Sequence, residues 1–143
     1  MKKILISKSY YFFILLLPII ICSCREDIIP PNSPVTNINE PVTSNSKNYY
    51  SFFVNAKNAS YTVVDHTYLD YGSTNLFYTV TNHSGGYISL ILTDNYNNVQ
   101  YQEIISSNSS GTSKNIKEAN PDIVEIIFYN FTGQLQIQIT STM

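Results

Sequence analysis

Residues 133–140 read GQLQIQIT, and this stretch decides the class of fold. Leu135, Ile137 and Ile139 alternate with three glutamines, so one side of the segment is apolar and the other is polar. An extended strand turns successive side chains to opposite faces, whereas a helix would spread these residues around its circumference. The stretch therefore predicts a β-strand with one buried face and one face in water.

A residue pattern typical of β-strands extends upstream to Tyr49. Short runs rich in β-branched and aromatic residues alternate with clusters of Asn, Ser, Gly and Asp, and the clusters at 83–86, 94–98 and 130–133 indicate hairpins between neighbouring strands. This spacing predicts an all-β domain, a small antiparallel β-sandwich of about seven strands. The expected strands cover residues 49–54, 59–65, 74–81, 86–93, 99–105, 122–130 and 133–140.

The apolar positions of these strands supply the expected core. The domain must manage without disulfides, because Cys22 and Cys24 both lie near the N-terminus. Each large side chain contributes about 1.5–3 kcal/mol when it is fully buried. The expected core residues are Phe52, Val54, Tyr61, Val63, Phe77, Val80, Ile88, Leu90, Leu92, Ile104, Val124, Ile126, Phe128, Leu135, Ile137 and Ile139.

The segment 106–121 (SSNSSGTSKNIKEANP) departs from the strand pattern. It is polar and rich in serine, and its final Asn-Pro pair would end a helix. Ser113 is a residue type that caps helix N-termini, so we expect a short helix over Lys114–Ala119. Long loops inside compact domains often have a function, but a solvated connection explains the composition equally well.

Residues for catalysis or metal binding are scarce. The two histidines, His66 and His83, sit in turn-like contexts without ligand spacing, and zinc needs three or four converging ligands. The cluster at 94–98 has a tyrosine where a calcium loop needs an oxygen ligand. The sequence contains neither a Gly-x-Ser-x-Gly motif nor a glycine-rich phosphate loop. We therefore expect a protein that is not an enzyme and that needs no cofactor or metal.

The distribution of charge limits the partners. From Cys24 onward, five basic side chains stand against all ten acidic ones, which gives a net charge of −5. Nucleic acid and anionic lipid surfaces both require a basic stripe or cluster. An acidic chain with scattered lysines has neither, so we expect no nucleic-acid partner.

Tyrosine dominates the aromatic residues, with 12 copies against 7 of phenylalanine and no tryptophan. Tyrosine suits the wet face of a strand, which explains most single copies. It also gives rigid contact area at low entropy cost, so it is common at binding surfaces. In the group Tyr68-Leu69-Asp70-Tyr71 we expect Tyr68, Asp70 and Tyr71 to contact a ligand.

The N-terminus has the organisation of a secretory signal. Lys2 and Lys3 precede an apolar run of 12 residues, 10–21 (YYFFILLLPIII), which Pro18 interrupts. The run is too short for a spanning helix, which needs about 20 residues. It matches the roughly 7–15 residues of a signal-peptide core.

Residues 21–24 (ICSC) resemble the lipobox of bacterial lipoproteins, in which an aliphatic residue and two small residues precede the cysteine that receives diacylglycerol. The resemblance implies cleavage before Cys24 and acylation of that residue, palmitate included. Two or more acyl chains would anchor the protein stably in a membrane. Cys22 is the rival acceptor, but it would place the bulky Ile21 at the cleavage site.

Arg25, Glu26 and Asp27 follow that cysteine directly and resemble the surface-export signal of Bacteroidetes lipoproteins. The alternative is that they only begin a solvated linker. The chain up to Lys47 is rich in proline and has no regular period, which predicts a disordered tether. The expected organisation is a signal peptide over 1–23, the lipidated cysteine and tether over 24–47, and the β-sandwich domain over 48–143.

Together these features resemble a small surface lipoprotein of the Bacteroidetes type. The resemblance implies an outer-membrane protein that is held by its lipid anchor and exposed on the cell surface. The expected function is a binding or accessory module that contacts a glycan, an envelope protein or a host protein. The alternatives are an inhibitor or immunity lipoprotein and, third, a hydrolase that uses carboxylates brought together by the fold.

Overall fold

A computed structural model describes residues 37–70, 72–117 and 119–142. Within these residues every regular element is a β-strand. No helix in this part of the chain is long and apolar enough to cross a membrane. The expected signal peptide, Cys24, Arg25, Glu26, Asp27 and Tyr71 lie outside the described residues.

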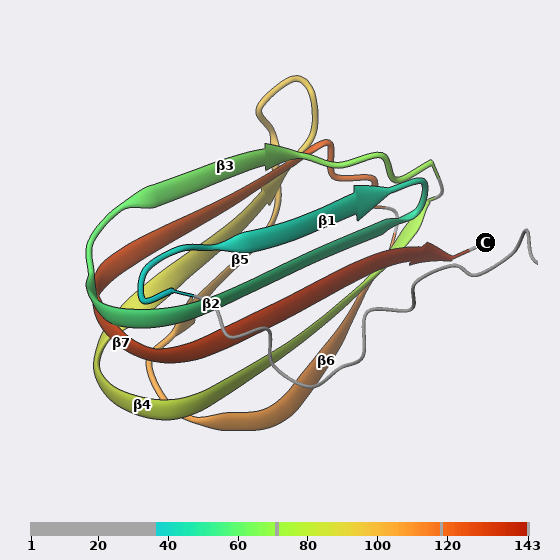
Figure 1. The fold of residues 1–143 in the computed structure, drawn as a ribbon. Coiled ribbons are helices and arrows are strands. Elements are labelled where there is room, and N and C mark those ends of the chain that lie inside the picture. The colour runs from blue at the N-terminus through green and yellow to red at the C-terminus, as the bar shows by residue number, and fades with distance from the viewer. Residues whose placement is uncertain (1–36, 71, 118, 143) are drawn as a thin grey trace, which may run out of the picture. The chain divides into compact units, whose positions relative to one another are not determined.

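Seven antiparallel strands form the domain, which confirms the predicted fold class (Figure 1). Each strand pairs only with antiparallel neighbours, and β4 and β7 are much longer than the others. In chain order the strands are β1 (Val42–Ser46), β2 (Tyr49–Ala59), β3 (Thr62–His66), β4 (Ser73–Thr93), β5 (Val99–Ile105), β6 (Ser109–Lys117) and β7 (Ile123–Thr142).

The two long strands belong to both layers of the sandwich. Residues 73–81 of β4 pair with 134–142 of β7, and after a bend residues 87–93 pair with 123–129. On the first side of the bend β2 and β6 flank the pair, with β1 outside β2, which makes a five-stranded layer. On the other side β3 and β5 flank it, which makes a four-stranded layer. Figure 1 shows both long strands curving at the same end of the domain.

The clusters at 83–86 and 130–133 are bends inside continuous strands, so the prediction of hairpins there was wrong. Both halves of β4 stay paired with β7, and the register shifts on either side of Gly85. Such a bulge bends a strand and strengthens its twist without reversing the chain. The cluster at 94–98 is a hairpin turn as predicted, closed by a hydrogen bond of 3.1 Å from the Asp94 N–H to the Asn98 carbonyl.

Two Asn-x-Ser/Thr tripeptides interlock at the bent end of the sandwich. Asn58 and Asn130 both have positive φ angles, of 49° and 48°. The Asn58 N–H donates to Thr132 Oγ1, and the Asn130 N–H donates to Ser60 Oγ, each over 2.9 Å. Each hydroxyl donates in turn to the side-chain oxygen of the opposite asparagine. These contacts fix the β2–β3 connection against the bend of β7.

The core lies between the layers and contains twelve of the sixteen residues expected there. Tyr61 and Val63 are only partly buried against it. Phe77 and Ile104 are exposed, at 37% and 64%, so their prediction was wrong. A strand has a period of two, so Phe77 cannot share a face with Val80. The buried residues that the prediction missed include Tyr50, Leu69, Leu76, Tyr78, Ile105 and Phe131.

Two further expectations about the chain between strands were wrong. The segment expected to form a helix over Lys114–Ala119 lies largely in β6, where pairing with β4 outweighs the local preference of these residues. The range expected to be a tether contains β1, which pairs with β2 along its length. Both strands are polar edge strands, and their composition alone does not distinguish them from solvated loops.

Candidate functional site

Three segments meet at the end of the sandwich opposite the bends, and Asp122 connects them. The Asp122 N–H donates to the Thr93 carbonyl over 2.9 Å, and its own carbonyl accepts from the Thr67 N–H over 2.8 Å. Its carboxylate oxygen Oδ2 accepts the Asn95 N–H over 2.9 Å. We call this surface the loop end, and it consists of residues 67–70, 94–98 and 119–122.

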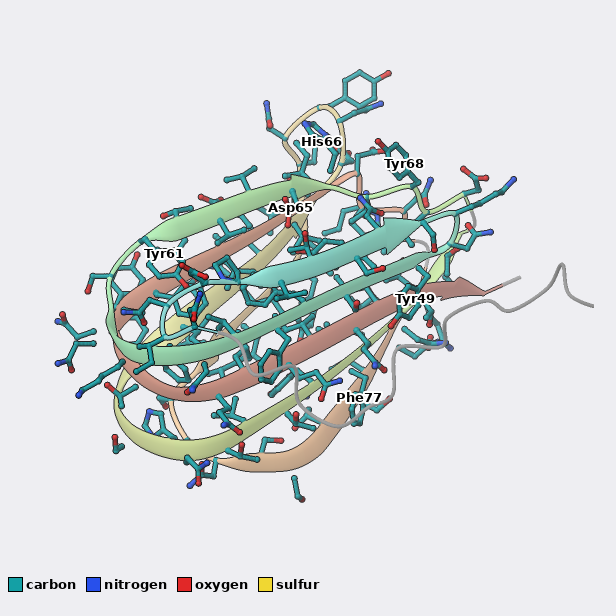
Figure 2. All side chains as sticks on the ribbon, viewed as in Figure 1. Tyr49, Tyr61, Asp65, His66, Tyr68 and Phe77 are labelled. Carbon is teal, nitrogen blue, oxygen red and sulfur yellow. The ribbon has the colours of Figure 1, made fainter. Side chains whose placement is uncertain are left out.

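The first of these segments presents alternate side chains to the core and to solvent. Thr67 and Leu69 are buried, whereas Tyr68 is 62% exposed and Asp70 is also exposed. The Thr67 hydroxyl donates to the Pro121 carbonyl and so joins this segment to the one before β7. Figure 2 shows Tyr68 beyond the end of β3, outside the two layers. Burial of Leu69 therefore holds Tyr68 out in solvent.

Asn48, in the turn between β1 and β2, fixes the backbone on both sides of Leu69. Its N–H donates to the Tyr68 carbonyl over 2.8 Å, and its side-chain oxygen accepts the Asp70 N–H over 2.9 Å. The Lys47 ammonium lies 3.1 Å from the Asp70 carboxylate. An ion pair this exposed adds little stability, but it places a charged pair at the loop that carries Tyr68.

The hairpin tip carries the most exposed aromatic side chain among the described residues, Tyr96, which is 80% exposed. Asp94 organises the tip, because its Oδ1 accepts the N–H groups of Tyr96 and Asn98 over 2.9 Å each. The hydrogen bonds from Asn98 and from the Tyr96 N–H hold the pKa of the Asp94 carboxyl below its usual value. The turn is therefore locally rigid while its aromatic ring is free in solvent.

Of the three residues predicted to contact a ligand, Tyr68 and Asp70 lie on one exposed loop, as the pattern requires. Tyr71 is outside the described residues. Tyr96 was not among the predicted residues, although its sequence context contains a signal: a large aromatic residue inside a polar turn has no core to enter. Its position beside the Tyr68 loop, through Asp122, depends on contacts between distant segments.

The histidines lie at opposite ends of the domain. His66 ends β3 next to the loop end, where its carbonyl accepts a hydrogen bond from the Asn45 side chain. His83 lies at the bend of β4, with Nε2 3.0 Å from the Gly86 carbonyl and its ring against Phe131. Within the described residues no three His, Cys, Asp or Glu side chains gather as metal ligands would.

A tyrosine–acid pair closes each open side of the sandwich. On one side the Tyr50 hydroxyl donates over 2.7 Å to Asp65 on β3, the residue labelled on that strand in Figure 2. Burial, reinforced by the hydrogen bond to Asp65 and its charge, raises the pKa of Tyr50. On the other side the hydroxyls of Tyr78 and Tyr101 both donate to Glu103 on β5. Burial is also the largest cause that raises the pKa of Tyr78 and of Tyr101.

The geometry of these tyrosine–acid pairs indicates a structural role and not a catalytic one. The two hydroxyls occupy both Glu103 oxygens, and the raised pKa of each tyrosine keeps it protonated near neutral pH. A neutral phenol that already donates to a carboxylate is neither a base nor an available acid. The loop end, with its exposed rings, amides and charged pair, is the better candidate for a functional surface.

Comparison with known proteins gives no family for the chain. No protein-family model matches it, and neither does any curated protein. One similar solved structure is a chain of the Bacillus endospore appendages, described as disulfide-linked pili, with 14% identity and a TM-score of 0.42, over 72% of this chain and 88% of that one. Another is described under CBM4 structure and function, with 14% identity and a TM-score of 0.34, over 71% and 85%.

Proposed function

We propose that this protein is a non-catalytic binding module of the bacterial cell envelope and that it binds its ligand at the loop end. The observation that carries the proposal is the display of Tyr68 and Tyr96 on two loops that Asp122 holds together. Both rings are well exposed, although burial of large apolar surface would stabilise the folded chain. A binding partner would supply that burial.

The rigidity of the loops supports this proposal. Binding loses affinity when loops and side chains must be ordered at the interface. Here Asn48 fixes the backbone at the Tyr68 carbonyl and the Asp70 N–H, and Asp94 fixes the backbone at Tyr96 and Asn98. A tyrosine ring has only two side-chain torsions to fix, so the two rings offer contact area at a low entropy cost.

The polar groups around the rings indicate the chemistry of the ligand. Asp70 and Lys47 form an exposed charged pair, and Asn95, Asn97 and Asn98 lie in the turn around Tyr96. Aromatic rings beside amides and carboxylates suit the apolar faces and hydroxyls of a sugar. They also suit a polar protein surface. The proposed ligand is therefore a glycan or an envelope or host protein.

A binding experiment with matched aromatic variants tests the loop end. A chain that begins at Pro34 contains all seven strands, and it would be used on a glycan array and as bait for solubilised envelope proteins. We expect Tyr68→Ala and Tyr96→Ala each to weaken binding at least about tenfold. Phe77→Ala, which removes an exposed ring from the outer face of the five-stranded layer, should leave binding unchanged. Equal losses in all three variants would contradict the assignment.

The proposal also includes the location of the module in the cell envelope. Cleavage before Cys24 and acylation of that residue would tether it to the outer membrane, and Arg25, Glu26 and Asp27 support export to the cell surface. We expect Cys24→Ala to abolish lipid labelling and to release the domain from membranes, whereas Cys22→Ala should leave both nearly unchanged. Protease added to intact cells should remove the parent domain. Loss of the lipid label in Cys22→Ala alone would indicate that Cys22, and not Cys24, is the acylated residue.

A further inference from the structure

The outer face of the four-stranded layer carries a cluster of apolar side chains, with Thr62, Gln102 and Glu125 among them. It consists of the side chains of β3, β5 and the adjoining halves of β4 and β7 that point away from the core. Val64 and Ile104 on the flanking strands are 56% and 64% exposed. Between them lie the half-buried Ile91, Ile123 and Ile127. We call this surface the isoleucine face.

A stacked aromatic pair extends the isoleucine face toward the bent end. Tyr87 on β4 lies opposite Tyr129 on β7. The ring centroids are 4.5 Å apart with an interplanar angle of 18°, and both side chains remain partly exposed. Since each ring covers one face of the other, the two rings form one packed apolar unit and do not offer two separate surfaces for stacking.

The outer face of the five-stranded layer is different. There Gln134, Gln136 and Gln138 point to solvent from β7, beside Asn75 and Thr79 of β4. Antiparallel sheets in small domains commonly have one face on the core and a polar face in water. Phe77 and the half-buried Phe53 interrupt this polar surface, so the five-stranded layer follows the pattern more closely than the four-stranded layer does.

The charges of the domain argue against two occupants for the isoleucine face. All four described lysines (Lys47, Lys57, Lys114 and Lys117) belong to strands of the five-stranded layer or to its β1–β2 turn. On the isoleucine face the ionisable groups are Glu125 and, at its margin, His66. A surface without lysine or arginine attracts neither anionic lipid nor nucleic acid. The occupant must offer an apolar surface with little charge.

We propose that the isoleucine face packs against the same face of a second copy of this chain. A copy supplies a mainly apolar surface of matching size, and the carboxyl group of Glu125 is the one acidic group that each side contributes. Two sheets can pack face to face at a distance of about 10 Å, as they do inside a β-sandwich. The polar outer face of the five-stranded layer then closes the assembly at two copies, because an isologous contact uses the same surface on both partners.

The size of the face sets the strength of the contact. Four strands at about 4.8 Å spacing and seven residues at about 3.3 Å rise give a patch of roughly 19 Å by 23 Å. Counted on both copies, this area is roughly 870 Å², which is below the limit of about 1,000 Å² for a stable specific interface. The dimer is therefore weak and forms where the protein is concentrated, as on a membrane surface. This inference is independent of the ligand proposed for the loop end.

Sedimentation equilibrium of the chain beginning at Pro34 tests the proposal. That chain contains every strand, the whole core and no cysteine, so disulfides cannot link its copies. We expect the average mass to rise from that of a monomer toward that of a dimer between about 10 μM and 1 mM, the range in which an interface of this size dissociates. Ile104→Lys and Val64→Lys should each weaken the dimer at least about tenfold, because they place a charge in the contact.

A variant of the other outer face is the control. Gln136→Lys adds the same charge to the five-stranded layer and should leave the association unchanged, and far-UV circular dichroism would confirm that all variants fold. A monomeric mass up to 1 mM would overturn the proposal. So would a dimer that Gln136→Lys dissociates and Ile104→Lys does not. Capture of a different envelope protein by an otherwise monomeric chain would also overturn it and would assign the isoleucine face to that protein.

Discussion

Two tyrosines inside the sandwich have their hydroxyls paired with an acid on each edge strand of the four-stranded layer. Tyr50 and Tyr78 belong to the core, yet each hydroxyl reaches a carboxylate, Asp65 or Glu103, on a flanking strand. A buried hydroxyl without a partner would cost about 1–3 kcal/mol. The pairs therefore let Tyr50 and Tyr78 fill both sides of the core without leaving their own hydroxyls unsatisfied.

These pairs predict instability in alkaline solution. Burial, followed by the hydrogen bond and the charge of Asp65, raises the pKa of Tyr50 from its ordinary value of 10.0, and Tyr78 and Tyr101 shift in the same direction. Above about pH 10 the unfolded chain releases these protons while the folded chain retains them. The contribution of these tyrosines to the free energy of unfolding should therefore be constant below pH 10 and fall above it. Urea midpoints from pH 8 to 11.5 would measure this change.

Phenylalanine variants separate this effect from general alkaline damage. Tyr50→Phe removes one titrating group from the core, so its free energy of unfolding should fall less steeply above pH 10 than that of the parent. Tyr68→Phe, on the exposed loop, should keep the parental slope. If Tyr50→Phe loses stability as steeply as the parent, the alkaline transition has another origin.

Among the strands, β4 depends on one glycine at its bend. Gly86 has φ of 72°, and a Cβ added there would lie well inside van der Waals contact with the backbone of Tyr129 and Asn130. The positive φ alone costs a side chain about 1–2 kcal/mol, and a clash with paired backbone adds to it. We expect Gly86→Ala to destabilise the domain by about 2–4 kcal/mol in urea unfolding.

The neighbouring glycine is a matched control for the same strand. A Cβ at Gly85 would have no heavy atom within 4 Å. Gly85→Ala should therefore change the free energy of unfolding by less than about 1 kcal/mol. Comparable losses in the two variants would mean that the bend requires flexibility of the whole Gly85-Gly86 pair rather than space at Gly86.

The strands that could be predicted from the sequence are those with a buried face. The alternation around Leu135, Ile137 and Ile139 marks β7, and these three side chains are fully buried. The bends at Gly86 and Gly133 could not be predicted, because the same residue types form a hairpin turn or a bulge. The partner strand decides between the two, and it is distant in sequence.

Edge strands and the candidate site were predictable only in part. The residues of β1 and β6 have no apolar alternation, so nothing local separates them from loops, and pairing with β2 and β4 decides their structure. Tyr68 and Asp70 were found from composition. Their convergence with Tyr96 passes through Asp122, a contact between segments that lie far apart in the chain.

As a whole, the domain has two distinct candidate surfaces. The loop end lies where the strands finish, whereas the isoleucine face covers the broad side of the four-stranded layer. A contact on a broad side leaves the ends of the strands accessible. A dimer formed through the isoleucine face would therefore present two loop ends at once, and a repetitive ligand could bind both with increased avidity.

The centre of the sheet comes latest in the chain. β7 is the last of the seven strands in sequence, yet it pairs with β2, β3 and β4 and separates β4 from the other two. A chain still leaving the ribosome lacks the strand on which the two layers assemble. Until residues 123–142 emerge, β2 can pair only with β1 and β3 has no partner strand, so the sandwich can form only after the last strand has been made.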